Sequence, residues 1–258
     1  MKVLNGRELA DYIKERQAHQ VKALRSRKIF PKLAIFYDND SPVIATYMRL
    51  KQRYGDDIGI AVEVIKIDEH NYETELKRAA NDQKTQGMII QLPLKALPIS
   101  ILDMIPYEKD VDGLRGKTDT ATAMAIHWLL TSYGVDLVNQ KLAIVGRGKL
   151  VGAPLERMWQ ESNYDVTVFE KGSDLNELVN YDVIVTATGV PGLIKSEMLK
   201  DGATIVDAGT ASEDGVIKGD LDEAARERDD LTLTPKIGGV GPLTVAMLFE
   251  RVLQATEK

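Results

Sequence analysis

Apolar and polar residues follow patterns typical of alternating strands and helices in the first part of the chain. Mostly apolar runs at 33–37 and 87–91 predict buried strands, and the alternating run at 61–67 predicts a third. Helical spacing of apolar residues predicts helices over 7–26, 43–54 and 72–84. Asn5 is placed to cap the first helix, and Gly55 is expected to interrupt the second. This order implies a parallel sheet covered by helices, which is an α/β fold.

The second half of the chain repeats the alternation after a polar segment at 113–119. Strands are expected at 141–145, 165–169, 183–186 and 203–207, and helical segments at 121–133, 153–162, 174–179, 196–199 and 243–253. The chain is therefore predicted to form two α/β domains, residues 1–116 and a Rossmann-like domain over 117–242. The C-terminal helix, residues 243–258, is expected to pack back onto the first domain.

Composition narrows the class of protein. The 258 residues are 44% hydrophobic and 28% charged, which is typical of a globular chain. No apolar run approaches the roughly 18 residues of a membrane span, and the N-terminus lacks an apolar signal-peptide core. Cysteine is absent and the three histidines lack metal-ligand spacing, so no metal site is expected. The net charge of −6 disfavours nonspecific nucleic-acid binding. We expect a cytoplasmic protein that acts on small molecules.

A glycine-rich turn follows the strand at 141–145. Gly146, Arg147 and Gly148 open it and Gly152 closes it, with one residue more than the usual dinucleotide fingerprint. Glycines let the backbone approach a pyrophosphate, and the following helix N-terminus favours its charge. An ordinary tight strand–helix turn is the alternative interpretation.

Two charged residues follow the next predicted strand. Glu170 lies near the distance from the turn at which an acid commonly contacts the ribose hydroxyls of NAD. Lys171 could instead meet the 2′-phosphate of NADP, and both residues could also be solvated loop charges. We expect a modest preference for NAD over NADP.

Tyr47 and Lys51 stand four residues apart on a predicted helix, so both lie on one face. A lysine in an apolar cleft can have its pKa lowered enough to act as a base, and a tyrosine hydroxyl can connect it to water or substrate. Gln91 ends a predicted strand before Leu92, where it could bond a heterocycle or orient Lys51. A surface pair and a polar strand end are the alternatives.

Two further segments carry candidate binding residues. Asp110 and Asp112 alternate before Gly113, and a carboxylate suits the N–H pair of an aminopyrimidine ring. A plain acidic turn is the alternative, because the other ligands of a calcium loop are missing. The second segment, 237–244, has three glycines in four positions, which indicates close backbone approach to a ligand or to another segment. Its Thr244 is a candidate cap for the last helix.

Taken together, these segments resemble the FolD family of bifunctional methylenetetrahydrofolate dehydrogenase/cyclohydrolases, in order from Leu33 to the C-terminal helix. The similar motifs are Tyr47-Met48-Arg49-Leu50-Lys51, Gln91-Leu92-Pro93-Leu94, Lys109-Asp110-Val111-Asp112-Gly113, Val151-Gly152-Ala153-Pro154, Thr186-Ala187-Thr188-Gly189-Val190-Pro191-Gly192 and Gly238-Gly239-Val240-Gly241-Pro242. Each motif is short, but six in the family's order are specific.

The resemblance implies a fold of two α/β domains with a cleft between them, usually as a homodimer, in which residues 1–116 bind folate and 117–242 bind NAD or NADP. The implied activities are oxidation of 5,10-methylenetetrahydrofolate and hydrolysis of the methenyl product to 10-formyltetrahydrofolate. The residues implied in catalysis or folate binding are Tyr47, Lys51, Gln91, Leu92, Asp112, Gly238, Gly239, Gly241 and Pro242. The residues implied in cofactor binding are Gly146, Arg147, Gly148 and Thr210, with Glu170 and Lys171 as the candidates named above.

Within this resemblance the implied roles differ. Lys51 is the key residue of hydrolysis, Tyr47 and Gln91 tune or position it, and Asp112 holds the pterin's pyrimidine edge. Gly148 replaces the family's usual serine, which removes a hydroxyl donor to phosphate. Thr120–Ala123 replaces the family's Pro-Cys-Thr-Pro segment. A monofunctional cyclohydrolase or dehydrogenase, or a folate-binding relative without catalysis, is the alternative function.

Overall fold

The computed structural model describes residues 2–209, 211–213 and 216–256. The chain divides into two compact units. The three-stranded unit comprises Asp11–Ala121 and Val245–Lys258, and the six-stranded unit comprises Met1–Ala10 and Thr122–Thr244. Each unit is built on a parallel sheet, so the predicted α/β class is confirmed.

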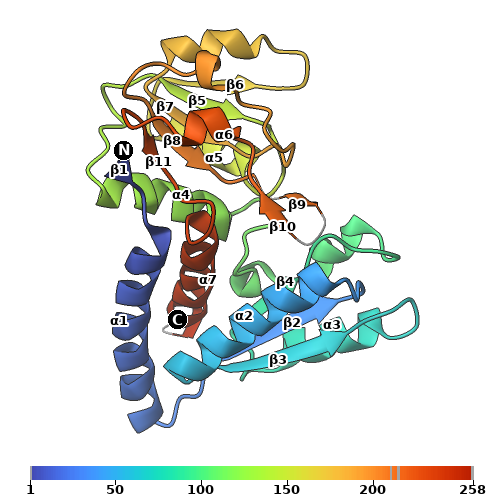
Figure 1. The fold of residues 1–258 in the computed structure, drawn as a ribbon. Helices are drawn as coiled ribbons and strands as arrows, with labels where there is room; N and C mark the ends of the chain where they lie inside the picture. Colours follow the sequence, from blue (N-terminus) through green and yellow to red (C-terminus); the bar gives the residue numbers. More distant parts are fainter. Residues whose placement is uncertain (1, 210, 214–215, 257–258) are drawn as a thin grey trace. The chain divides into compact units, whose positions relative to one another are not determined.

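The three-stranded unit holds the strand order β3-β2-β4, all parallel. These strands span Ala61–Lys66, Lys32–Tyr37 and Gly87–Ile90, and Figure 1 shows the helices α2 (Pro42–Ile58) and α3 (Tyr72–Asn81) beside them. Two short 3-10 helices, η1 (Ile99–Met104) and η2 (Tyr107–Lys109), follow β4. β2 is the central strand, and its residues 33–36 are fully buried. The predicted β-α-β-α-β order is therefore confirmed.

Helix α2 runs further than the sequence predicted. It continues through Gly55 to Ile58 and ends at Gly59, which adopts the left-handed conformation. Gly55 is buried inside the helix, and neighbouring atoms leave no room for a side chain there. A Cβ at this position would lie 2.4 Å from Val62 Cγ2 and 2.8 Å from the Ile60 carbonyl oxygen. The prediction of a break at Gly55 was wrong, since this glycine serves close packing and not a turn.

Two long helices contribute to the three-stranded unit. Helix α1 (Gly6–Ser26) is capped by Asn5, whose Oδ1 accepts from the Glu8 amide at 3.2 Å, as expected. Within the unit, Gln17 Nε2 donates to the Ala246 carbonyl at 3.0 Å and to Glu250 on α7 (Val240–Thr256). These bonds join the two helices through a buried amide.

The six-stranded unit holds a wholly parallel sheet in the order β1-β11-β8-β7-β5-β6 (Figure 1). Its strands are β1 (Lys2–Val3), β5 (Leu142–Val145), β6 (Val166–Phe169), β7 (Val183–Thr186), β8 (Thr204–Asp207) and β11 (Thr232–Leu233). Its helices are α4 (Ala121–Ser132), α5 (Gly152–Glu161) and α6 (Glu223–Arg226), with 3-10 helices η3 (Leu175–Asn180) and η4 (Ser196–Met198). β5 lies between β6 and β7, so successive connections leave it in opposite directions along the sheet. Open α/β sheets bind ligands at such a point.

Several short elements of this unit escaped the sequence patterns. They are β1, β11 and the antiparallel pair β9 (Ala211–Glu213) and β10 (Val216–Lys218). The expected capping role of Thr244 was also wrong. Helix α7 begins four residues earlier, and Thr244 Oγ1 donates to the Val240 carbonyl inside the helix at 3.1 Å.

Candidate functional site

Lys51 lies on α2 and is only 7% exposed. The helix that carries it begins at Pro42 and is capped by Ser41, whose hydroxyl accepts from the Ile44 amide. Lys51 Nζ donates to Gln91 Oε1 at 2.8 Å. Gln91 is the residue directly after β4, so the end of a parallel strand presents an acceptor to the buried amine.

Asp112 lies in the electrostatic field of the same amine. Burial raises the pKa of the Asp112 carboxyl, and the charge of Lys51 opposes that rise. Conversely, burial lowers the pKa of the Lys51 amine, and Asp112 partly offsets this effect. Burial thus makes the charged form costly for both groups, and their opposite charges offset part of that cost.

Arg251 on α7 is a member of this cluster that sequence reasoning missed. Its Nη1 donates to the Val111 carbonyl at 3.3 Å, next to Asp112 along the chain. Burial lowers the pKa of the Arg251 guanidinium, while Asp112 and two neighbouring carboxylates raise it. The available signal was the charged pair Glu250-Arg251, which interrupts an otherwise apolar helix.

The segment around Asp112 contains structural as well as chemical residues. Lys109 Nζ donates to the carbonyls of residues 79, 80 and 82, which closes the C-terminal end of α3. The carboxylate of Asp110 accepts from the amides of residues 113, 114 and 115, which shapes the turn. Asp112 alone of the two acids interacts with Lys51.

Tyr47 lies one helical turn before Lys51 and is half-buried. Its hydroxyl forms no hydrogen bond among the residues that the structure describes. Leu92 follows Gln91 and is joined to Pro93 by a cis peptide bond. The loop after it is held by Asp38, whose carboxylate accepts from three successive amides, of Lys95, Ala96 and Leu97, at 2.8–2.9 Å.

In the six-stranded unit, the predicted glycine turn lies directly after β5. Gly146 has a φ of 95°, a conformation that favours glycine, and a Cβ there would lie 2.8 Å from the Ala187 carbonyl oxygen after β7. A Cβ on Gly152 would lie 1.8 Å from the Gly146 carbonyl oxygen. The turn therefore folds tightly onto the start of α5. A Cβ on Gly148 would meet no atom within 4 Å, so the backbone at Gly148 borders open space.

Charged residues flank this turn. Arg147 Nε lies 2.8 Å from Glu156 Oε2 on α5, and Arg147 Nη1 lies 4.0 Å from Glu170 Oε1. Glu170 directly follows β6, and the adjacent Lys171 is exposed. The Glu156 partner was not predicted from the sequence. Thr210, the candidate for the nicotinamide end, lies outside the described residues.

The glycines of the segment 238–242 approach another part of the chain. Gly238 has a φ of 90°, and its carbonyl accepts from the Arg7 amide at 2.8 Å. A Cβ on Gly6 would lie 1.9 Å from the Gly239 carbonyl oxygen. The backbone of this loop therefore packs on the start of α1 in the six-stranded unit, while a Cβ on Gly241 would meet nothing within 4 Å.

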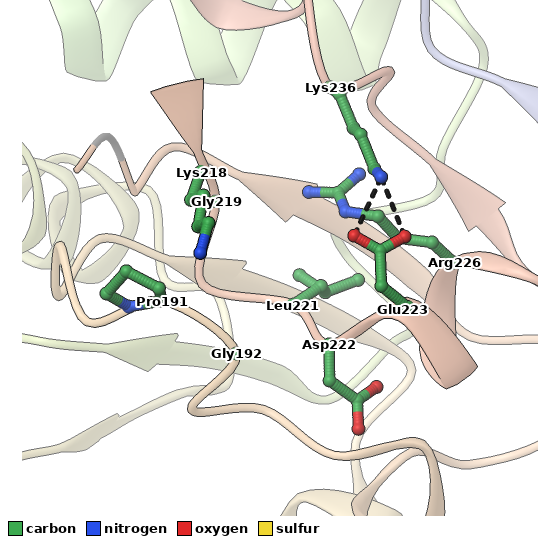
Figure 2. Close-up of a pocket in the computed structure, with 9 residues that line it drawn as sticks. All are labelled: Pro191, Gly192, Lys218, Gly219, Leu221, Asp222, Glu223, Arg226 and Lys236. Carbon is green, nitrogen blue, oxygen red and sulfur yellow. Dashed lines mark hydrogen bonds and ion pairs between the residues drawn. The ribbon is translucent and has the colours of Figure 1, made fainter. Parts of the chain in front are cut away.

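A pocket of about 370 Å³ in the six-stranded unit contains none of the predicted site residues (Figure 2). It is lined by Pro191, Gly192, Lys218, Gly219, Leu221, Asp222, Glu223, Arg226 and Lys236. Lys236 Nζ lies 2.7 Å from both carboxylate oxygens of Glu223, and Arg226 pairs with Asp207. These cations are neutralised within the protein. Across the described residues there is no group of three or more side chains suited to a metal, and no helix long and apolar enough to cross a membrane.

Comparison with known families gives two matches along the chain. Residues 4–112 match the catalytic domain of tetrahydrofolate dehydrogenase/cyclohydrolase, and residues 120–258 match its NAD(P)-binding domain. The chain belongs to the tetrahydrofolate dehydrogenase/cyclohydrolase family. The resemblance seen in the sequence motifs is therefore confirmed, as are the enzyme class and the NAD or NADP cofactor class.

Individual family members are similar over nearly their whole length. The bifunctional protein FolD of Staphylococcus aureus strain Newman is 32% identical, covering 98% of this chain and 96% of the relative. The FolD crystal structure from Campylobacter jejuni has a TM-score of 0.92 at 29% identity, covering 100% of this chain and 99% of that one. A Trypanosoma brucei FolD structure, described as complexed with NADP and an inhibitor, has a TM-score of 0.90 at 27% identity, with 99% and 97% covered.

Proposed function

We propose that this family member oxidises 5,10-methylenetetrahydrofolate with NAD(P)+ and hydrolyses the methenyl product to 10-formyltetrahydrofolate. The observation that carries the proposal is the buried Lys51 amine, hydrogen-bonded to Gln91 and interacting with Asp112, in a chain that matches both domains of the family. In the first reaction, a hydride passes from the methylene carbon to NAD(P)+, and a cationic methenyl group remains on the folate. In the second, water adds to that carbon, a ring C–N bond breaks and a proton is released.

Lys51 is proposed as the group that moves protons during hydrolysis. Burial lowers the pKa of its amine, which makes the neutral, proton-accepting form more accessible than in an exposed lysine. Gln91 holds Nζ in place through its amide oxygen, and Tyr47 offers a hydroxyl from the same helix. Asp112 is proposed to accept hydrogen bonds from the N–H pair of the pterin's pyrimidine edge.

The dinucleotide is proposed to bind at the turn after β5, where the bound cofactor supplies the hydride acceptor. The tight approach of Gly152 to Gly146 and the open space at Gly148 fit a pyrophosphate laid against the backbone. Arg147, Glu170 and Lys171 are proposed to line its adenosine end, with Thr210 at the nicotinamide end. Gly238, Gly239, Gly241 and Pro242, together with Leu92, are proposed to line the folate site.

The remaining parts of the proposal concern organisation and setting. Residues 1–116 with helix 243–258 are proposed as the folate-binding domain, and 117–242 as the dinucleotide-binding domain, in agreement with the order of the two family matches. A homodimer in the cytoplasm, without nucleic-acid partners, is proposed from the family resemblance and the acidic net charge.

A paired spectrophotometric assay tests the proposal. One arm follows reduced cofactor formed from methylenetetrahydrofolate with NAD+ or NADP+, and the other follows hydrolysis of methenyltetrahydrofolate. Both activities are expected. Hydrolysis without hydride transfer, or the reverse, would identify a monofunctional enzyme, and folate binding without either activity would identify a binding protein.

A further inference from the structure

The end of β6 lies directly beside the glycine turn. The Gly146 amide donates to the Phe169 carbonyl at 2.8 Å, and Val145 pairs with Phe169 in the parallel register of β5 and β6. Glu170 is therefore the first residue beyond the strand next to the turn. In Rossmann-like domains, a residue in this place faces the ribose of a dinucleotide whose pyrophosphate lies on the first turn.

The arginine of the turn is already engaged by carboxylates. Arg147 Nε and Nη2 lie 2.8 Å and 3.4 Å from the two oxygens of Glu156, and Nη1 lies 4.0 Å from Glu170. The Glu156 side chain is 13% exposed, so it is a fixed partner on α5. These bonds and charges raise the pKa of the Arg147 guanidinium. The three side chains together carry a net charge of −1.

This arrangement distinguishes the two forms of the cofactor. The 2′-phosphate of NADP adds about two negative charges, as other phosphate monoesters do, and would meet two carboxylates and a guanidinium that is already paired. The free 2′-hydroxyl of NAD can instead donate to the Glu170 carboxylate. Lys171, the next residue along the chain, carries a positive charge that could favour the phosphate, and its side chain is exposed.

We propose that Glu170 selects NAD over NADP, and that Glu156 supports this choice by holding Arg147 away from a 2′-phosphate. This inference rests on the proposed dehydrogenase function and adds the determinant of cofactor choice. Glu170 is the specificity-determining residue and Glu156 is a positioning residue.

The test is isothermal titration of the full-length protein with NAD+ and NADP+ in the absence of folate, which measures dissociation constants independently of turnover. The wild type is expected to bind NAD+ about tenfold more tightly, the order of one charge-assisted hydrogen bond. Glu170→Gln should weaken NAD+ binding and tighten NADP+ binding. Glu156→Gln should tighten NADP+ binding and leave NAD+ binding nearly unchanged, because it frees Arg147.

Two matched variants complete the experiment. Glu161→Gln removes one negative charge from the exposed end of α5 and should change neither constant. Lys171→Gln should also leave the preference for NAD+ intact. Tighter binding of NADP+ than of NAD+ by the wild type would overturn the inference, as would an unchanged preference for NAD+ in Glu170→Gln. The dehydrogenase function would stand in either case. Failure to bind either dinucleotide would overturn the proposed dehydrogenase function itself, and with it the inference.

Discussion

Lys51 Nζ lies 2.8 Å from Gln91 Oε1, and the other end of the same amide donates to the Leu92 carbonyl at 3.0 Å. The second bond fixes the orientation of the amide, so that its oxygen and not its nitrogen faces the amine. A residue at the end of β4 thus sets the position of a side chain on α2. The result is a buried amine that Gln91 positions by a hydrogen bond. Burial lowers the pKa of this amine, and the charge of Asp112 partly offsets that effect.

Asp112→Asn should shift the pH dependence of methenyl hydrolysis to lower pH. Burial lowers the pKa of Lys51 below its ordinary value of 10.5, and the Asp112 charge works against that shift by favouring the ammonium. Without the charge, the pKa of Lys51 falls further, and the neutral amine forms at lower pH. The measurement is the rising limb of kcat against pH. Because kcat is taken at saturating folate, weaker folate binding by the variant does not affect it. Asp103→Asn, whose side chain is 77% exposed, is the control, and a limb that stays or moves upward in Asp112→Asn contradicts the account.

Asp38→Asn should destabilise the protein by about 1–3 kcal/mol near pH 7. The reason is that three backbone amides now donate to a carboxylate, and the substitution removes its charge. Although burial opposes it, three backbone amides lower the pKa of Asp38 below 3.8. The stabilisation is therefore fully present above pH 3.8 and is lost as pH falls through the folded-state pKa. Urea unfolding of both proteins should show a difference near neutral pH that shrinks in acid. Equal stability near pH 7 would refute the role of Asp38.

Gly55→Ala should lower the free energy of unfolding, although alanine is the better helix former by about 1 kcal/mol. The new methyl group would lie 2.8 Å from the Ile60 carbonyl, which is backbone and cannot rotate away. Overpacking of this kind costs about 1–3 kcal/mol. Gly241→Ala, where a Cβ meets nothing within 4 Å, is the matched control and should not destabilise. If Gly55→Ala proves as stable as the wild type, the packing argument fails.

Gly148→Ser should tighten dinucleotide binding. The position has open space and no requirement for a positive φ, so a serine is accommodated, and its hydroxyl adds a donor for phosphate. A net hydrogen bond is worth about 0.5–1.5 kcal/mol, which corresponds to about two- to tenfold in the dissociation constant. Gly148→Ala adds the Cβ without the hydroxyl and separates the two effects. Binding by the serine variant that is no tighter than binding by the alanine variant would exclude the hydroxyl as the missing donor.

The main strands and the order of chemical motifs could be predicted from the sequence because local patterns encode them. Apolar runs such as 33–37 are short enough to favour a buried strand over a helix, and the alternation of strands and helices favours parallel pairing. Contacts between residues distant in sequence left no such pattern. The proximity of Arg251 to Asp112 depends on where α7 packs, and the pairing of β1 with β11 joins residues more than two hundred positions apart.

Glycine and charge carried more than one meaning in the sequence. Gly55 resembles a helix break, but the Val62 side chain and the Ile60 backbone lie where its Cβ would be. Gly238 and Gly239, by contrast, approach another segment, as their spacing indicated. Lys109 and Asp110 share a motif with Asp112, yet they bond backbone groups of neighbouring loops and helices. A residue's type and spacing nominate it for a role, and its contacts decide between structure and chemistry.

Lys51→Met tests the central claim most directly, with methenyltetrahydrofolate hydrolysis and folate affinity measured on the same preparation. Hydrolysis is expected to fall by about 100-fold or more, the order expected when a general acid–base group is removed, while folate still binds. Lys77→Met, which replaces an exposed lysine, is the control and should hydrolyse like the wild type. Unchanged hydrolysis in Lys51→Met would contradict the assignment of Lys51.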